Sequence, residues 1–325
     1  MITNRLVTAA SIVASMCLLP SNVLLSSTAH GDTFGSGASV FDIAFVRVDS
    51  PGNARDTDGI GDNGAVDYEY RISKYEIPEL AIDHANTLGN LGITKDTRDP
   101  NKPATSIDWF EAARFVNWLN TSAGFAPAYK FDASGTFQLW ESGDAGYDPN
   151  NLFRNTNTNY VLPTLDEWYK AAYYDPVAAD YVEFATGSNQ EPIAVPNGTD
   201  PNTAVFGSFL GLTGPAEVTL AGGEGLFGTV GQSGNIAEWV ETAGVGINDD
   251  PIEARSLRGG AWDASPSSVS RDGGGTGIPE AASSNLGFRI ASLIVPEPAS
   301  SMLLFAGFAL LIDSRRSMQM RRLFR

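Results

Sequence analysis

The side chains that most often do chemistry in proteins are scarce in this chain. Its single cysteine is Cys17, and its only histidines are His30 and His84. Cys17 lies in an apolar stretch near the start, so the rest of the chain has no thiolate nucleophile and no disulfide. Two histidines without a cysteine cannot form a closed zinc site. Carboxylates and arginines are therefore the groups left to consider.

Carboxylates gather in the turn-rich stretch of residues 49–67. Asp56, Asp58 and Asp62 lie there among Gly, Asn and Pro residues. Their oxygens could bind calcium, although their spacing does not match an EF-hand loop. Asp and Asn also form turns by bonding their own backbone. The pattern favours a plain turn and leaves a calcium loop as the alternative.

A second polar group contains Arg271, Asp272 and Glu280. General acid–base catalysis by this group would need a base, and no histidine follows in this part of the chain. Exposed arginines and aspartates are more often solvated than catalytic. We therefore predict no catalytic residue here.

Hydrophobic periodicity predicts the elements that must position these groups. Alternating residues predict strands at 41–48 and 68–75. Helical spacing predicts helices at 79–88 and at 107–119, the second with Ser106 as its N-cap.

A third helix starts at Thr164, which forms a capping-box pattern with Glu167, and it ends before Pro176. The stretches 121–160 and 180–228 lack a clear period but are too rich in apolar residues for disorder. The whole chain has 34 Gly and 18 Pro, and together with these stretches this favours a loop-rich fold that presents its function on loops.

The net charge of −17 argues against a nucleic-acid partner, because binding to a duplex needs a basic face. Such an acidic body keeps a protein soluble and also attracts divalent cations.

The two ends of the sequence have the features of targeting signals. Residues 1–29 have a short positive start, an apolar stretch and small residues before position 30, which is typical of a signal peptide. Near the other end, Pro296-Glu297-Pro298 precedes the apolar run 302–312 and an arginine-rich tail. This end resembles the PEP-CTERM sorting signal of Gram-negative bacteria, and a plain membrane anchor is the alternative.

Four segments between these ends, taken in order, resemble the sulfatase-modifying-factor domain of formylglycine-generating enzymes. They are residues 70–77, 103–118, 162–172, and the group 234–239 with 258–262 and 287–289, which contains Asn235, Trp239, Gly259, Gly260, Gly287, Phe288 and Arg289. The resemblance implies an α+β fold of the C-type-lectin-like class, rich in loops, with small antiparallel sheets and a few short helices. It implies three parts, namely a signal peptide at 1–29, this domain at 30–292 and a sorting signal at 293–325.

The best-known member of the family oxidises a sulfatase cysteine through two cysteines that bind copper. Laid against this chain, those cysteines fall at Ala264 and Val269. Copper(I) selects thiolates, so no copper is expected. The family also binds calcium, and the resemblance implies Glu238 and the main-chain oxygens of Gly234 and Ile236 as ligands. The alternative is that Glu238 pairs locally.

These observations predict an exported, non-catalytic family member that serves as a binding or structural module. The alternative is a protein oxidoreductase with an altered active site. The stretch 263–284, with Trp262, Asp263, Arg271 and Asp272, is the predicted recognition surface for an extracellular glycan or protein. The sorting signal implies recognition by an exosortase, transient anchoring through the C-terminal segment, and delivery to the cell surface or extracellular matrix.

Overall fold

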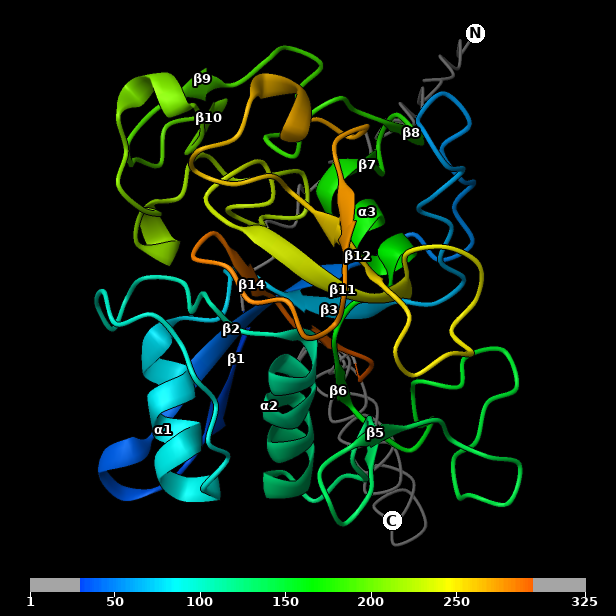
Figure 1. Cartoon of the computed structure of the whole chain (residues 1–325). Coiled ribbons are helices and arrows are strands. Elements are labelled where there is room, and N and C mark those ends of the chain that lie inside the picture. Colours follow the sequence, from blue (N-terminus) through cyan, green and yellow to red (C-terminus); the bar gives the residue numbers. More distant parts are fainter. Residues whose placement is uncertain (1–29, 295–325) are drawn as a thin grey trace, which may run out of the picture.

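The computed structural model describes residues 30–294 (Figure 1). The predicted signal peptide and almost all of the predicted sorting signal lie outside the described residues. Within 30–294, no helix is both long enough and apolar enough to cross a membrane. This range contains three α-helices, which are α1 (Glu79–Gly89), α2 (Trp109–Ser122) and α3 (Leu165–Tyr173).

The larger sheet has five antiparallel strands and contains both ends of the described chain. In spatial order they are β1 (His30–Phe34), β2 (Phe41–Val48), β3 (Tyr70–Ser73), β15 (Ala291–Ser292) and β6 (Tyr160–Val161). The predicted strand at 41–48 is confirmed. The strand predicted at 68–75 is shorter, because pairing with β2 stops at Tyr70, and the Tyr68 hydroxyl donates to Glu167 instead.

The second sheet has four strands and a mixed topology. Its spatial order is β13 (Gly275–Gly277), β12 (Arg255–Arg258), β11 (Ala237–Ala243) and β14 (Leu286–Phe288). Strand β11 is antiparallel to β12 but parallel to β14, where Glu238 lies opposite Gly287. A Cβ at Gly287 would lie 2.3 Å from the Ala104 carbonyl oxygen, so only glycine fits this crossing.

The remaining regular structure is short. The loops of the described residues contain three pairs of short strands, which are β4 (Lys130–Phe131) with β5 (Phe137–Gln138), β7 (Tyr174–Asp175) with β8 (Asp180–Tyr181), and β9 (Ile193–Ala194) with β10 (Thr203–Ala204). They also contain four 3₁₀ helices, which are η1 (Gly37–Ser39), η2 (Ser208–Leu210), η3 (Val218–Leu220) and η4 (Pro266–Ser268). Ordered loop therefore makes up much of the domain, as the glycine and proline content predicts.

The helix starts follow capping chemistry, with one correction. Thr164 and Glu167 form the predicted capping box of α3, and α1 matches the predicted helix at 79–88. The predicted N-cap Ser106 is wrong. Its φ is +59°, whereas an N-cap residue is extended, and the cap of α2 is Asp108, whose Oδ1 accepts from the Glu111 amide at 2.6 Å.

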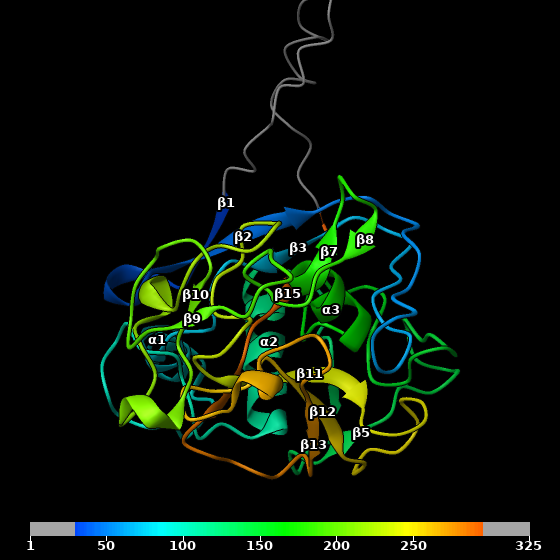
Figure 2. The same ribbon diagram turned by 90° about the horizontal axis from the view of Figure 1, so that it is seen from above.

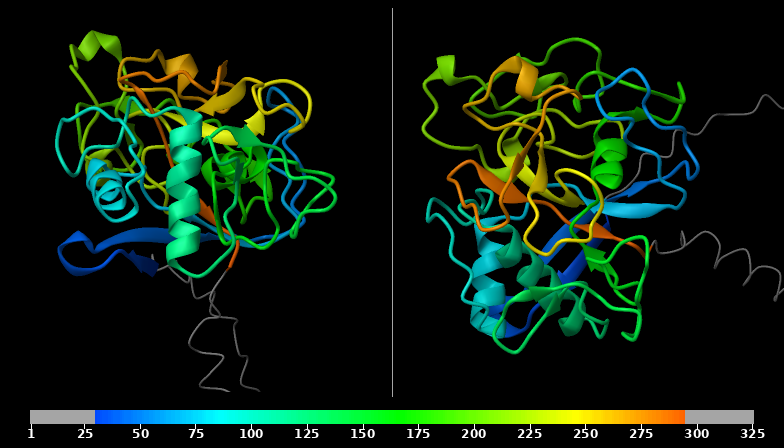
Figure 3. Two further views of the ribbon diagram at one scale, coloured as in Figure 1. Left: turned by 60° about the horizontal axis from the view of Figure 1, so that its bottom comes forward. Right: turned by 45° about the vertical axis from the view of Figure 1, so that its right-hand side comes forward.

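The core joins both sheets through three fully buried tryptophans. Trp109 lies on α2, Trp168 on α3 and Trp239 on β11. Each indole finds a buried acceptor, since Trp109 donates to the Val240 carbonyl and Trp239 to the Ile107 carbonyl. Helices α1 and α2 lie side by side beneath the smaller sheet in Figure 1. The left view of Figure 3 shows α2 between α1 and the loops around β4 and β5.

Candidate functional site

The positions that would hold copper-binding cysteines lie in a small apolar cluster. Val269 is fully buried and packs with Phe184, Ala204 and Phe206, and Ala264 lies partly buried against the same group. Methyl and isopropyl groups offer no ligand to copper(I), which selects thiolates. Residues 30–294 contain no cysteine that could substitute.

Glu238, the predicted calcium carboxylate, lies in a fully buried ion pair with Arg289. The Arg289 Nε lies 2.7 Å from Oε2 and its second terminal nitrogen 2.8 Å from Oε1. The Trp168 indole donates to Oε2 at 2.7 Å. Arg289 also donates to the main-chain oxygens of Ser73 and Val230. The partner of Glu238 is thus 51 residues away along the chain.

A second buried glutamate, Glu76, lies next to this ion pair and has no counterpart in the sequence prediction. Its Oε2 accepts from the Asn235 amide at 2.7 Å, while its Oε1 has no hydrogen-bond partner among the described residues. Burial raises the pKa of Glu76 well above its usual value, and the charge of Glu238 raises it further. Arg289 contacts Glu238 and acts on Glu76 through its charge alone, so one arginine faces two carboxylates when both are ionised.

The contacts of Glu238 and Glu76 show which of the two carboxylates could bind the calcium that the family resemblance implies. Glu238 does not fit as a ligand, because the Arg289 guanidinium donates to both of its oxygens and already balances its charge. Glu76 fits, because a buried carboxylate oxygen without a partner suits a hard cation. Gly234 and Ile236 flank Asn235, the residue whose side chain contacts Glu76.

The family-motif residues hold loops together around these carboxylates. Asn235 has a φ of +62°, accepts from the Ala216 amide at 2.7 Å through its side chain, and accepts from the Trp262 amide through its carbonyl. The Gly234 amide donates to the Gly259 carbonyl at 2.7 Å. The other motif residues Trp239, Gly260, Phe288 and Arg289 are buried or half-buried in the same region.

The four residues of the predicted recognition surface differ in their contacts and exposure. Arg271 pairs with Asp56 at 3.2 Å and with Glu183 at 3.3 Å, and Asp272 accepts from the Ile60 amide at 2.9 Å. Arg271 and Asp272 thus hold the Asp-rich loop of residues 49–67 against the domain. Trp262 is half-buried, and Asp263 is exposed and accepts from Asn285, 3.1 Å away.

The Asp-rich loop itself is a turn, as favoured from the sequence. Asp56 is buried, and its Oδ1 accepts from the amides of Asp58 and Gly59. Its Oδ2 accepts from the Tyr169 hydroxyl at 2.7 Å. Among the described residues, no group of three or more His, Cys, Asp or Glu side chains is placed to hold a metal ion.

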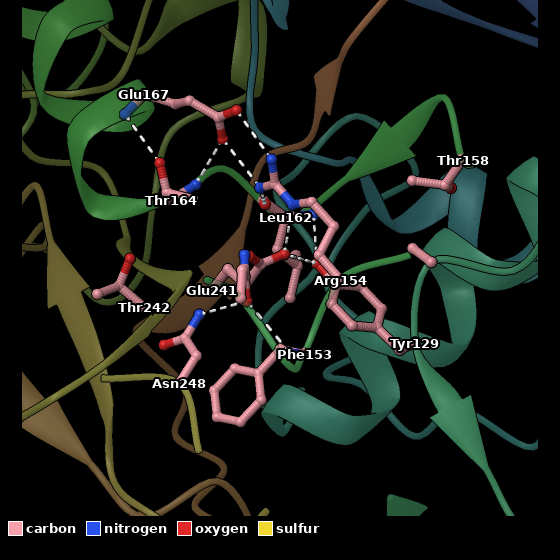
Figure 4. Close-up of polar contacts among 12 residues, drawn as sticks. Tyr129, Phe153, Arg154, Thr158, Leu162, Thr164, Glu167, Glu241, Thr242 and Asn248 are labelled. Atoms are coloured by element: carbon pink, nitrogen blue, oxygen red, sulfur yellow. Dashed lines mark hydrogen bonds and ion pairs between the residues drawn. The ribbon is translucent and has the colours of Figure 1, made fainter. Parts of the chain in front are cut away.

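A further buried polar network centres on Arg154 and was not predicted from the sequence (Figure 4). Arg154 donates to both oxygens of Glu167, at 2.9 and 3.0 Å, and to Glu241 at 2.9 Å. The Tyr129 hydroxyl also donates to Glu241, at 2.8 Å. Burial acts to raise the pKa of Glu167, but the charge of Arg154 outweighs it and the pKa lies below its usual value. Only the Glu167 cap is visible as a local pattern.

Comparisons with known proteins agree with this architecture. A family model described as the sulfatase-modifying factor enzyme 1-like domain matches residues 68–294. Variable protein 1 of Treponema denticola is 18% identical, covers 82% of this chain and 100% of its own, and has a TM-score of 0.56. The crystal structure of CarF is 20% identical, with 78% and 99% coverage and a TM-score of 0.54. PvdO from Pseudomonas aeruginosa is 15% identical, with 81% and 98% coverage and a TM-score of 0.53.

No curated protein matches the sequence. At these identities the solved structures show the fold alone, and that fold is the predicted α+β, C-type-lectin-like fold. The family model covers most of the chain, including the segments that build the Glu238 ion pair and the apolar cluster around Val269. The chain therefore belongs to the sulfatase-modifying factor enzyme 1-like domain family.

Proposed function

We propose that this chain is an exported, non-catalytic member of its family and serves as a binding or structural module at the cell surface or in the extracellular matrix. The observation that supports the proposal most is the apolar cluster at the reactive positions, where Val269 packs against Phe184 and Phe206. A mixed disulfide with a substrate cysteine needs a thiol, and residues 30–294 have none. The fold is kept while the reactive groups of the known reaction are missing.

An oxidation assay tests the proposal against its alternative, a protein oxidoreductase with an altered site. Purified protein is incubated with a sulfatase-motif peptide, copper and oxygen, beside an authentic formylglycine-generating enzyme as the positive control. We expect no aldehyde product from this protein by mass spectrometry. Turnover that depends on the protein would overturn the non-catalytic proposal and favour the oxidoreductase.

The proposed localisation rests on the two predicted targeting signals, with an exosortase as the sorting partner. Figure 2 shows β1 and the C-terminal end of the described chain on one side of the domain. A transient anchor at the C-terminal end would then turn the opposite side outward. Replacing Pro296, Glu297 and Pro298 with alanine should keep the protein in the membrane fraction, whereas the native chain is released. Equal release of both would argue against this route.

Calcium remains a proposal, placed at Glu76 with the main-chain oxygens of Gly234 and Ile236. The support is the buried Oε1 of Glu76, which has no hydrogen-bond partner among the described residues, and the neighbouring charge of Glu238, whose own oxygens are both bound by Arg289. Saturating calcium should raise the melting temperature by on the order of 5 °C over chelator, because a ligand that binds only the native state stabilises it. Glu76→Gln should abolish that shift. If Glu76 is instead protonated and binds no ion, calcium should not change the melting temperature. Glu76→Gln should then have nearly the same stability as the native protein.

A further inference from the structure

A cavity of about 250 Å³ opens between the N-terminal end of α2 and the loop that joins β11 to β12. We call that loop, residues 244–254, the hairpin loop. Phe110 and Phe137 form one apolar side of the cavity, and Pro251 and Ile252 of the hairpin loop form another. A volume of this size is small for a drug-like ligand but suits one long side chain.

Charged groups stand at the same cavity. Asp108 and Glu280 supply carboxylates, and Arg114 supplies a guanidinium that lies 4.0 Å from Glu111. Asp108 is half-buried and caps α2. Glu280 is exposed, and its side chain has no hydrogen bond or ion pair with any residue in the described range 30–294. The cavity therefore pairs aromatic walls with a net negative charge and one free carboxylate.

Four exposed aliphatic residues lie on the segments that contribute to the cavity, and we call these four residues the aliphatic rim, of which Ile252 lines the cavity itself. The side chains of Val245, Ile247, Ile252 and Ile278 are between 63% and 80% exposed. The first three lie on the hairpin loop, and Ile278 follows β13, which pairs with β12. A contiguous exposed apolar surface marks an interaction site, and three of these four residues lie within eight positions of one loop.

Acidic side chains accompany this rim. The hairpin loop contains Asp249, Asp250 and Glu253 and no lysine or arginine. Figure 2 shows β12 and β13, and the loop beside them, on the side away from β1 and the C-terminal end of the described chain. These strands and their loop thus lie away from the side that would be next to an anchor.

We infer that this cavity binds a protein segment that inserts a lysine or arginine side chain flanked by aliphatic residues. The aliphatic stem of such a side chain would pack on Phe110 and Phe137, and its cationic head would meet Glu280. The flanking residues would cover Ile252 and its aliphatic neighbours. An anionic membrane or polymer is repelled by the acidic loop, and a polar glycan would leave the isoleucines uncovered. The inference rests on the proposed binding function and names its site and partner chemistry.

Three pentapeptides test the inference on the purified protein by isothermal titration calorimetry. Each has one central residue between two isoleucines, and that residue is lysine, norleucine or glutamate. We expect the lysine peptide to bind tightest and the glutamate peptide weakest. Glu280→Gln should lower the affinity for the lysine peptide about fivefold and leave the affinity for the norleucine peptide unchanged, because only an ion pair is lost. Ile252→Ser should lower the affinity for the lysine and norleucine peptides about tenfold, because less apolar surface is buried.

Matched controls use surface residues of the same types elsewhere. Val177→Ser changes a side chain that is 89% exposed between β7 and β8, and Glu191→Gln changes an exposed glutamate. Neither should alter binding. No binding by any peptide, equal affinity for lysine and glutamate, or unchanged binding by both cavity variants would overturn the inference. Aldehyde formation in the separate oxidation assay would instead overturn the proposed function.

Discussion

Buried arginines hold distant segments of this domain together. Arg289 pairs with Glu238, and Arg154 binds Glu167 and Glu241 at once. The low dielectric inside the protein makes these contacts strong only while each charge has its partner. The native state therefore depends on them more than a surface ion pair would suggest.

Removing Arg289 tests that dependence. Arg289→Met leaves Glu238 and Glu76 buried together without a cation, so the free energy of unfolding should fall by about 3–5 kcal/mol. Arg47→Met is the matched control, because its pair with Glu69 is exposed at 40% and 33% and should contribute less than about 1 kcal/mol. Urea denaturation measures both. Equal losses of unfolding free energy in the two variants would show that the buried ion pair stabilises the protein no more than the exposed one.

Lys170 makes stability depend on pH at the alkaline end. Burial lowers the pKa of its ammonium to about 8, although the carboxylates of Asp49, Glu69 and Asp67 act in the other direction. An unfolded lysine titrates near 10.4, so between about pH 8 and 10 the unfolded chain binds more protons. Stability from this group therefore rises with pH across that window.

The variant Lys170→Met isolates this effect. The destabilisation caused by the buried charge is fully present below pH 8 and absent above about pH 10. The free energy of unfolding of the native chain should therefore rise relative to that of Lys170→Met as pH increases from 7.5 to 10. Urea titrations at several pH values measure the difference, in which other titrating groups cancel. A constant difference would contradict the prediction.

At the scale of elements, the start of α2 depends on one cap. The Asp108 carboxylate accepts from the Glu111 amide, and the Glu111 carboxylate accepts from the Asp108 amide at 3.1 Å. This reciprocal pair satisfies two amides that the first turn leaves free. Ser106, two residues earlier, makes only a backbone bond to Ser283.

Two alanine variants separate these residues. Asp108→Ala should lower the free energy of unfolding by about 1 kcal/mol, through loss of the cap. Ser106→Ala should change it by less than about 0.5 kcal/mol, because the serine side chain caps nothing. Thermal melts of both proteins measure the difference. The reverse order of effects would mean that α2 starts earlier than Trp109.

At the scale of the whole molecule, Arg71 fastens the two ends of the domain. Its guanidinium lies 2.9 and 2.7 Å from the two Asp32 oxygens on β1. It also donates to Ser292 on β15 and to the Ile294 carbonyl. The first and last strands of the fold are therefore held against the same side chain.

Arg71→Met should loosen both end strands together. Hydrogen exchange should speed up on β1 and β15, because each loses charged hydrogen bonds to one shared donor. Exchange in β11, which lies in the other sheet, should change least and provides the internal control. Faster hydrogen exchange in β1 alone would contradict the prediction that Arg71 stabilises both end strands.

Local patterns were readable from the sequence because their physics is local. Thr164 and Glu167 are three residues apart, so the capping box of α3 appears in the sequence itself. For α2 the sequence predicted Ser106 as the cap, because a serine before an apolar run is typical of an N-cap. Its positive φ, which excludes that role, depends on the turn that it occupies. The missing thiols follow from counting alone.

The partners of the buried charges depended on the tertiary structure. Arg271 meets Asp56 across 215 residues of chain, and Glu76 meets Asn235 across 159. No spacing rule links such residues, because their contact depends on how the sheets and loops pack. The family and the absence of its thiols were thus evident from order and type of residue, whereas the pairing of Glu238 and the free oxygen of Glu76 exist only once the chain is folded.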